Sequence, residues 1–197
     1  MAGEDKSGEK QVDSWKCEDM VIEAGKYFRN KFGYEDMYFN EKGFLLHAEF
    51  PMGIALVMKG LCGTRGEPRI IGELYGVLQV FESLGKDRLA EFLKLLAHVT
   101  GETFISAGLG PNDEIILEPY LPFSILYTPD AANLDMPFNE FVSGAFLTFI
   151  ALATWVSVNI VRAMRDQPMV SFDPSKISDI AREELGGEIP LPGVLQL

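Results

Sequence analysis

The sequence predicts an α+β domain in which helices flank an antiparallel sheet, in the element order αβββαββα, with a proline-broken tail. Three observations predict this class. Short apolar runs are separated by turns rich in glycine, proline and asparagine, as is typical of antiparallel strands. Two segments place apolar residues at helical spacing. Residues 141–161 form a long apolar helix near the C-terminal end that contains no charged side chain.

The first predicted helix covers residues 15–33. Asp13 or Ser14 can cap its start, and Gly33 is suited to end it. Apolar residues recur along one side at helical spacing: Trp15, Met20, Val21, Ala24, Tyr27, Phe28 and Phe32. This side is expected to face the core. Residues 1–13 are polar and charged, and we expect a disordered lead there.

Three strands are expected to follow this helix. Residues 37–40 and 44–50 flank the sequence Asn-Glu-Lys-Gly, which predicts a β-hairpin with glycine in the turn. Residues 54–61 are rich in side chains that favour strands and form the third. Residues 62–69 contain two glycines and a proline, so a loop is predicted there.

Residues 70–84 fit both a helix and an alternating strand. Gly72 and Gly76 weaken a helix, so the sequence slightly favours a strand that runs into a turn at Gly85. Residues 86–100 predict a strongly amphipathic helix. One face of it carries Leu89, Phe92, Leu93, Leu96 and Val99, and Gly101 is expected to end it.

Two further strands, residues 104–109 and 114–126, are joined by the turn sequence Gly-Pro-Asn-Asp. Prolines restrict the second of them to an edge or to an irregular end. A loop at residues 128–137 follows. Oxygen side chains gather from this loop to the start of the long helix: Asp130, Asn133, Asp135, Asn139 and Glu140. They lack the spacing of a calcium-binding loop, so we expect them to cap that helix.

The apolar segment 141–161 is long enough to cross a bilayer. Two observations favour a buried core helix instead. Hydroxyl, amide and glycine residues dilute its apolar character. The arginines that follow it, Arg162 and Arg165, favour the cytoplasmic side, which would require export of the preceding residues without a signal peptide.

The tail offers a cover for this helix. Asp173 and Pro174 begin a short amphipathic helix that carries Ile177, Ile180, Ala181 and Leu185. Residues 188–197 are apolar but interrupted by proline. We therefore expect a single domain over residues 14–165, with residues 166–197 as a short helix and an extended tail that packs on it.

Acidic residues outnumber basic ones, 29 to 17, which gives a net charge of −12 at pH 7. No lysine or arginine occurs between Lys94 and Arg162. Binding to nucleic acid or to anionic lipid requires clustered cations, so both partners are disfavoured. The chain has two cysteines, Cys17 and Cys62, which can form a disulfide. We favour free thiols in a reducing cytoplasm, and hence a cytoplasmic location.

No catalytic signature is intact. Phosphate-binding glycine loops, the dinucleotide fingerprint and the hydrolase Gly-x-Ser-x-Gly motif are all missing. The two histidines, His47 and His98, have no metal-ligand spacing. We therefore expect no enzymatic activity, no cofactor and no metal. Arg65 and Arg69, beside the glycine loop, are candidates for contact with an anion or with a partner carboxylate.

The second half of this pattern resembles the type III secretion chaperone-like fold, which includes the YbjN-like family. The similarity lies in the helix at 86–100, the hairpin around Gly-Leu-Gly-Pro-Asn-Asp-Glu, the acidic loop and the long helix. It extends over residues 15–164 and concerns the order of elements. The resemblance implies a non-enzymatic, acidic and often dimeric protein that binds other polypeptides.

These observations predict a protein-binding or regulatory domain that works as a homodimer. A helix that is apolar on all sides needs cover beyond one sheet face. We therefore predict a partner or dimer interface on the long helix at Ala145, Phe149, Leu152 and Val156. Two alternatives remain: a membrane anchor at residues 141–161, or a protein that binds a small ligand or a metal.

Overall fold

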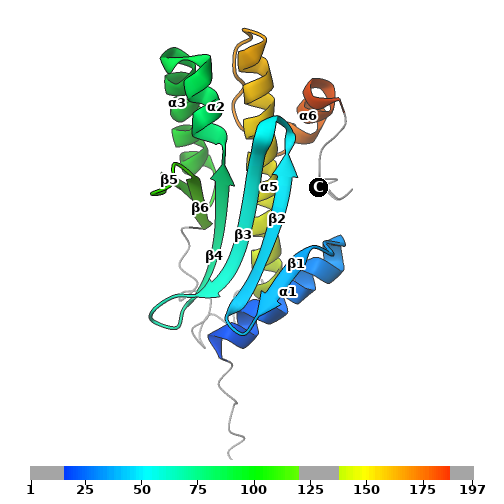
Figure 1. Ribbon diagram of the computed structural model, residues 1–197. Coiled ribbons are helices and arrows are strands. Elements are labelled where there is room, and N and C mark those ends of the chain that lie inside the picture. The colour runs from blue at the N-terminus through cyan, green and yellow to red at the C-terminus, as the bar shows by residue number, and fades with distance from the viewer. Residues whose placement is uncertain (1–15, 120–137, 187–197) are drawn as a thin grey trace, which may run out of the picture.

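The computed structural model describes residues 16–119 and 138–186. Figure 1 shows the elements in chain order. They are α1 (Cys17–Phe32), β1 (Met37–Asn40), β2 (Gly43–Phe50), the short helix η1 (Pro51–Gly53), β3 (Ile54–Cys62), β4 (Pro68–Tyr75), α2 (Val77–Leu84), α3 (Lys86–Glu102), β5 (Ile105–Leu109), β6 (Ile115–Pro119), α5 (Phe138–Met164) and α6 (Ile177–Leu185).

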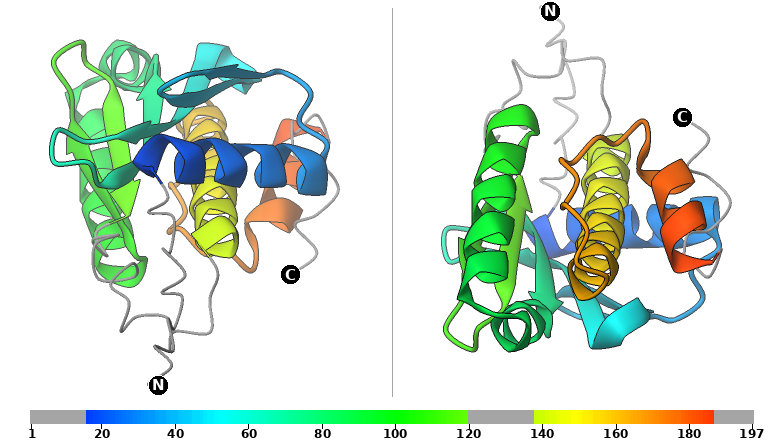
Figure 2. Two further views of the ribbon diagram at one scale, coloured as in Figure 1. Left: turned by 90° about the horizontal axis from the view of Figure 1, so that it is seen from below. Right: turned by 90° about the horizontal axis from the view of Figure 1, so that it is seen from above.

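The predicted α+β class is confirmed: an antiparallel sheet of six strands is combined with helices, one of them long and apolar. The strands lie in the order β1-β2-β3-β4-β6-β5. Helices α1 and α5 pack against β2 and β3, and α3 packs beside β5. In both views of Figure 2, α1, α3, α5 and α6 lie on the same side of the sheet.

The element order differs from αβββαββα by one additional strand and one additional helix. The ambiguous residues 70–84 account for both, because β4 continues to Tyr75 and α2 then covers Val77–Leu84. The favoured strand is therefore confirmed for the first half and wrong for the second. Gly76 makes the change of direction with φ of +82°, and an added Cβ would lie 2.6 Å from the carbonyl oxygen of Gly53.

Helix α5 is the centre of the core. It is the one described helix that is long and apolar enough to cross a membrane, yet 83% of its apolar window is buried against the rest of the protein. Phe149 packs on β4 where Gly72 leaves room, since a Cβ on Gly72 would lie 2.9 Å from the ring. Trp155 stacks on Phe92 of α3 at 5.7 Å between ring centroids.

The segment after α5 runs back along this helix and is fastened to it by buried polar side chains. Asn159 is fully buried. Its side-chain nitrogen donates to the Val170 carbonyl (3.2 Å), and its side-chain oxygen accepts from the Val170 N–H (2.8 Å). The indole of Trp155 donates to the same carbonyl (2.8 Å). The prediction that the tail packs on its own domain is therefore confirmed for the described residues up to 186.

Helix α6 begins at Ile177, three residues after the predicted start at Pro174. The Asp173 carboxylate accepts the Ser175 N–H at 3.0 Å and forms a turn ahead of the helix. The predicted cap at Asp13 or Ser14, the loop 128–137 and the tail 188–197 lie outside the described residues.

A disulfide joins Cys17, the first residue of α1, to Cys62, the last residue of β3. The expectation of free thiols is therefore wrong. Cys17 and Cys62 are 45 positions apart in the sequence. Only the packing of α1 across β2 and β3 places them together.

Candidate interaction surface

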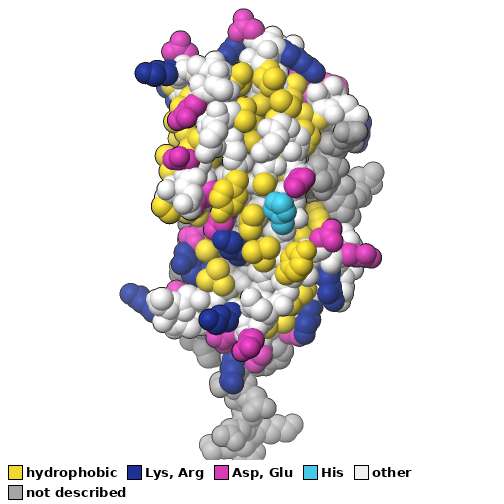
Figure 3. Space-filling view, in the orientation of Figure 1, with side chains coloured by type: hydrophobic (Ala, Val, Ile, Leu, Met, Phe, Trp, Pro, Cys, Tyr) yellow, Lys and Arg dark blue, Asp and Glu magenta, His cyan; other side chains and the backbone are white. Residues whose placement is uncertain are grey.

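One face of the sheet carries no described helix. Along β2, Phe44, Leu46 and Phe50 are buried toward the helices, whereas Leu45, His47 and Glu49 alternate with them and point to the opposite side. The same alternation continues along β3 and β4. We call the opposite side the open face. Figure 3 shows hydrophobic side chains over its strands, with charged side chains denser toward the margins.

The apolar part of the open face consists of half-buried aliphatic side chains on four neighbouring strands: Leu45, Val57, Leu61, Ile71 and Ile116. The strand register interleaves them with charged residues. Lys59 lies opposite Leu45 on one side and Ile71 on the other, and Glu73 lies between Val57 and Ile116. Aliphatic and charged side chains are therefore direct cross-strand neighbours on the open face.

The charges at the centre of the open face neutralise each other. The Lys59 ammonium donates to both carboxylate oxygens of Glu73 at 2.6 Å, and the Tyr75 hydroxyl donates to one of them at 2.6 Å. The hydrogen bond to Glu73 raises the pKa of Tyr75 to about 12, with burial as a smaller cause. The phenol therefore remains protonated at neutral pH and acts as a donor.

A second ion pair lies on the open face between β4 and β6. The Arg69 guanidinium on β4 donates to the Glu118 carboxylate on β6. The open face thus presents aliphatic groups, two internal ion pairs and the exposed carboxylate of Glu49, on a molecule whose net charge is −12. Surfaces of low net charge and high apolar content are typical of protein interaction sites.

A shallow depression of about 340 Å³ lies at the β1–β3 end of the sheet. Its lining includes Tyr38, Leu45, Lys59 and Leu61, which belong to the open face. Tyr38 is 70% exposed and is the most exposed large hydrophobic side chain of the described residues.

The predicted interface on α5 lies inside a single chain. Ala145, Phe149, Leu152 and Val156 are each at most 1% exposed, because the sheet and its neighbours cover them. A surface that binds a partner has to be accessible. These four residues are not accessible within the chain, whereas the side chains of the open face are.

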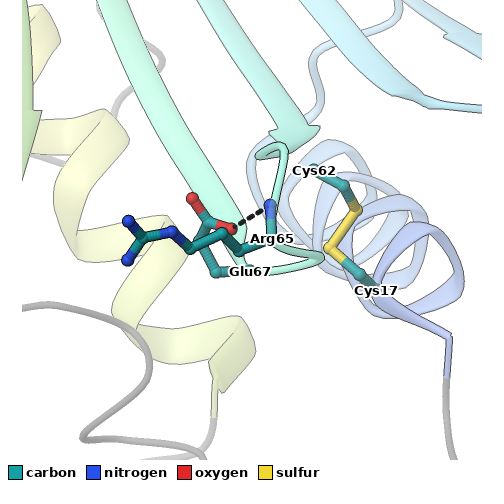
Figure 4. The surroundings of a disulfide bond; sticks show 4 residues. All are labelled: Cys17, Cys62, Arg65 and Glu67. Atoms are coloured by element: carbon teal, nitrogen blue, oxygen red, sulfur yellow. Dashed lines mark hydrogen bonds between the residues drawn. A yellow bond between two sulfur atoms is a disulfide. The ribbon is translucent and has the colours of Figure 1, made fainter.

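The structure does not bring Arg65 and Arg69 into one site. Arg69 is engaged by Glu118. Arg65 lies in the turn between β3 and β4, where its backbone N–H donates to the Glu67 carboxylate at 3.0 Å. In Figure 4 the Arg65 guanidinium points away from Glu67 and from the disulfide.

The described residues contain no cluster of three or more side chains that could hold a metal ion. His47 lies on the open face and His98 on α3, and both are exposed. Of the predicted oxygen cluster, Glu140 is bound by the Lys31 ammonium at 2.8 Å and by the Tyr27 hydroxyl. The Lys31 hydrogen bond, followed by that of Tyr27, lowers the pKa of Glu140.

Sequence reasoning missed the open face. The signal was weak, because in β2 only His47 and Glu49 alternate with apolar residues, and in β3 Lys59 is the one polar side chain. It was hidden because the outward positions include leucine, valine and isoleucine. A strand with such residues on both sides reads as buried on both sides.

No family model, no curated protein and no solved structure matches the chain.

Proposed function

We propose that this protein is a non-enzymatic, polypeptide-binding domain that works as a homodimer, in the manner of a secretion chaperone. The observation that carries the proposal is the open face. It combines half-buried aliphatic side chains, an exposed tyrosine and two ion pairs within the face. Among the described residues, no cluster of three or more side chains that could hold a metal ion competes with it.

The charge of the molecule indicates the chemistry of the partner. The apolar rows of the open face favour a partner that alternates apolar residues with polar ones, as an extended segment does. A net charge of −12 attracts cationic segments over long range and repels acidic ones. The partner is therefore a polypeptide segment that alternates apolar and basic residues.

The experiment is a fluorescence anisotropy titration of the full chain with a labelled peptide of alternating valine and lysine. A peptide with glutamate in place of lysine is the comparison. We expect the basic peptide to bind at least about tenfold more tightly than the acidic one. Val57→Glu, at the centre of the open face, should weaken binding of the basic peptide by about tenfold or more.

Met164→Glu is the matched control, because Met164 is 56% exposed at the end of α5 on the helix side of the molecule. This variant adds the same charge and should bind as the unchanged protein does. Circular dichroism confirms that both variants are folded. Equal binding by the two variants, or equal affinity for the two peptides, contradicts the proposal.

The dimer is supported by the edge of the sheet at β5. This strand carries neither charge nor proline, and no described strand pairs with its outer edge. Natural edges of this kind are normally protected by charged residues or proline. Leu109 of β5 is 63% exposed and Leu93 of the adjacent α3 is 37% exposed. The opposite edge, β1, has only four residues and is flanked by Asp36 and Glu41.

Two copies related by a twofold axis perpendicular to the sheet would pair β5 with β5 in antiparallel orientation. In this arrangement both open faces lie on the same side, so the surface available to a polypeptide doubles in width. The helices of both copies then lie together on the other side.

A further inference from the structure

The two cysteines of the chain are placed as a fastening between the helix layer and the sheet. Cys17 begins α1 and Cys62 ends β3, with 6.0 Å between their Cα atoms. Figure 4 shows the bond where the start of α1 meets the turn that follows β3. Both residues are half-buried, so the bond is within reach of a small reductant or of an oxidising partner.

The start of α1 has few other fastenings. Lys16, at the N-cap position, makes no capping hydrogen bond through its side chain. Further along, Val21, Ala24 and Phe28 are fully buried and hold the middle of the helix. At the far end, Lys31 and Tyr27 bind Glu140 of α5. In the first turn of α1, Cys17 and Met20 pack only partly buried against the core, so the disulfide fixes the least buried end of this helix.

The other side of the bond is preorganised. In the turn after Cys62, the Gly63 N–H donates to the Glu67 carbonyl at 2.7 Å, and the Arg65 N–H donates to the Glu67 carboxylate at 3.0 Å. Cys62 itself lies opposite Pro68 in the β3–β4 ladder. Because these contacts hold the turn, Cys62 presents its sulfur to α1 from a fixed position.

We propose that Cys17 and Cys62 are a site of oxidative modification, and that the resulting bond is a clamp that holds the start of α1 to the turn after β3. Formation of the bond removes one hydrogen from each Sγ. The two protons and two electrons pass by thiol–disulfide exchange to a disulfide oxidant, which becomes a dithiol. This inference does not depend on the proposed function, and it replaces a reducing cytoplasm by an oxidising environment as the place where the protein works.

The first experiment is alkylation followed by mass spectrometry on the full chain, secreted into an oxidising compartment and purified without reductant. We expect no alkylated cysteine before reduction and two alkylated cysteines after it. Two reactive thiols in the unreduced protein would overturn the inference.

The second experiment measures denaturant unfolding of the same protein with and without a phosphine reductant. Closure of a loop of 45 residues predicts that reduction raises the unfolding equilibrium constant by about 10² to 10³-fold. Cys17→Ala/Cys62→Ala should equal the reduced protein and should not respond to reductant. If this variant does not fold, the comparison of oxidised and reduced protein still decides. Equal stability of the two redox forms contradicts the clamp.

Hydrogen exchange distinguishes a disulfide that stabilises mainly the start of α1, the clamp, from one that stabilises the whole fold evenly. On reduction, the clamp predicts that protection in the first turn of α1 and in residues 63–67 falls by more than protection around Phe28 and in α5, where the loss follows only the change in global stability. A uniform loss of protection over the described elements would show that the bond has no local role, and would overturn the clamp.

Discussion

Gly72 and Phe149 show how one missing side chain positions the whole helix layer. Gly72 lies in the middle of β4, and the Phe149 ring of α5 occupies the space above it. A methyl group there would lie 2.9 Å from the ring, which is closer than carbon atoms pack without displacement. The contact brings α5 close to the sheet and allows its side chains to fill the core.

Replacement of this glycine is therefore expected to destabilise the fold. Gly72→Ala should lower the free energy of unfolding by about 1–3 kcal/mol through overpacking against Phe149, measured by urea denaturation. Gly108→Ala is the control, because a Cβ at Gly108 of β5 has no neighbour within 4 Å. An equal effect of both substitutions would contradict the contact as the cause.

Tyr75 provides a test of the paired charges on the open face. Its pKa of about 12, against an ordinary value of 10.0, results first from the hydrogen bond to Glu73. Folding thus favours the protonated phenol. The resulting stabilisation is fully present below pH 10 and is lost as the pH rises from about 10 to 12.

An ultraviolet absorbance titration of tyrosinate measures this directly. We expect one tyrosine to ionise near pH 12, to disappear from the titration in Tyr75→Phe, and to return toward 10 in Glu73→Gln. An unchanged titration in Glu73→Gln would show that the hydrogen bond to Glu73 does not raise the pKa of Tyr75.

At the scale of elements, α5 and the segment behind it form one unit. The helix has the length and hydropathy of a membrane span, but its polar residues have internal partners. Thr154 and Ser157 donate to carbonyls of their own helix, and Asn159 binds both backbone groups of Val170. If α5 crossed a bilayer without the segment around Val170, the Asn159 side-chain amide would need another hydrogen-bond partner.

The buried amide predicts a measurable difference between two neighbouring polar residues. Asn159→Ala leaves the Val170 N–H without its partner, whereas the Val170 carbonyl keeps the hydrogen bond from the Trp155 indole. The substitution should cost about 1–3 kcal/mol of stability. Limited proteolysis should then cut residues 165–176 sooner. Ser157→Ala removes a hydroxyl that donates only to a carbonyl of its own helix, so we expect little change in stability or proteolysis. Equal proteolysis of the two variants would contradict the fastening.

Most elements of this fold are local and were predictable from the sequence. The periodicity around Phe28 and Phe92 identified α1 and α3, and the glycine turn after Asn40 identified the first hairpin. Residues 70–84 were not resolved, because Gly76 divides a segment whose halves follow different periods. The order of strands, the disulfide and the open face depend on contacts between distant segments, which a single sequence does not encode in its spacing.

At the scale of the whole molecule, apolar side chains lie on both sides of the sheet. The helix side buries α5 completely enough that its central residues cannot form an interface. The open side retains aliphatic residues and matched charges, and the β5 edge is unprotected. These features support a protein that binds polypeptides as a dimer and uses α5 as its core.

Light scattering on the full chain, after gel filtration in detergent-free buffer, tests this account most directly. The account predicts a monodisperse species of twice the 21.9 kDa chain mass. Leu109→Lys, at the β5 edge, should shift it to the monomer mass, whereas Tyr38→Lys, equally exposed at the opposite edge, should leave the dimer intact. A monomeric unchanged protein, or recovery of the chain only in detergent, would contradict it.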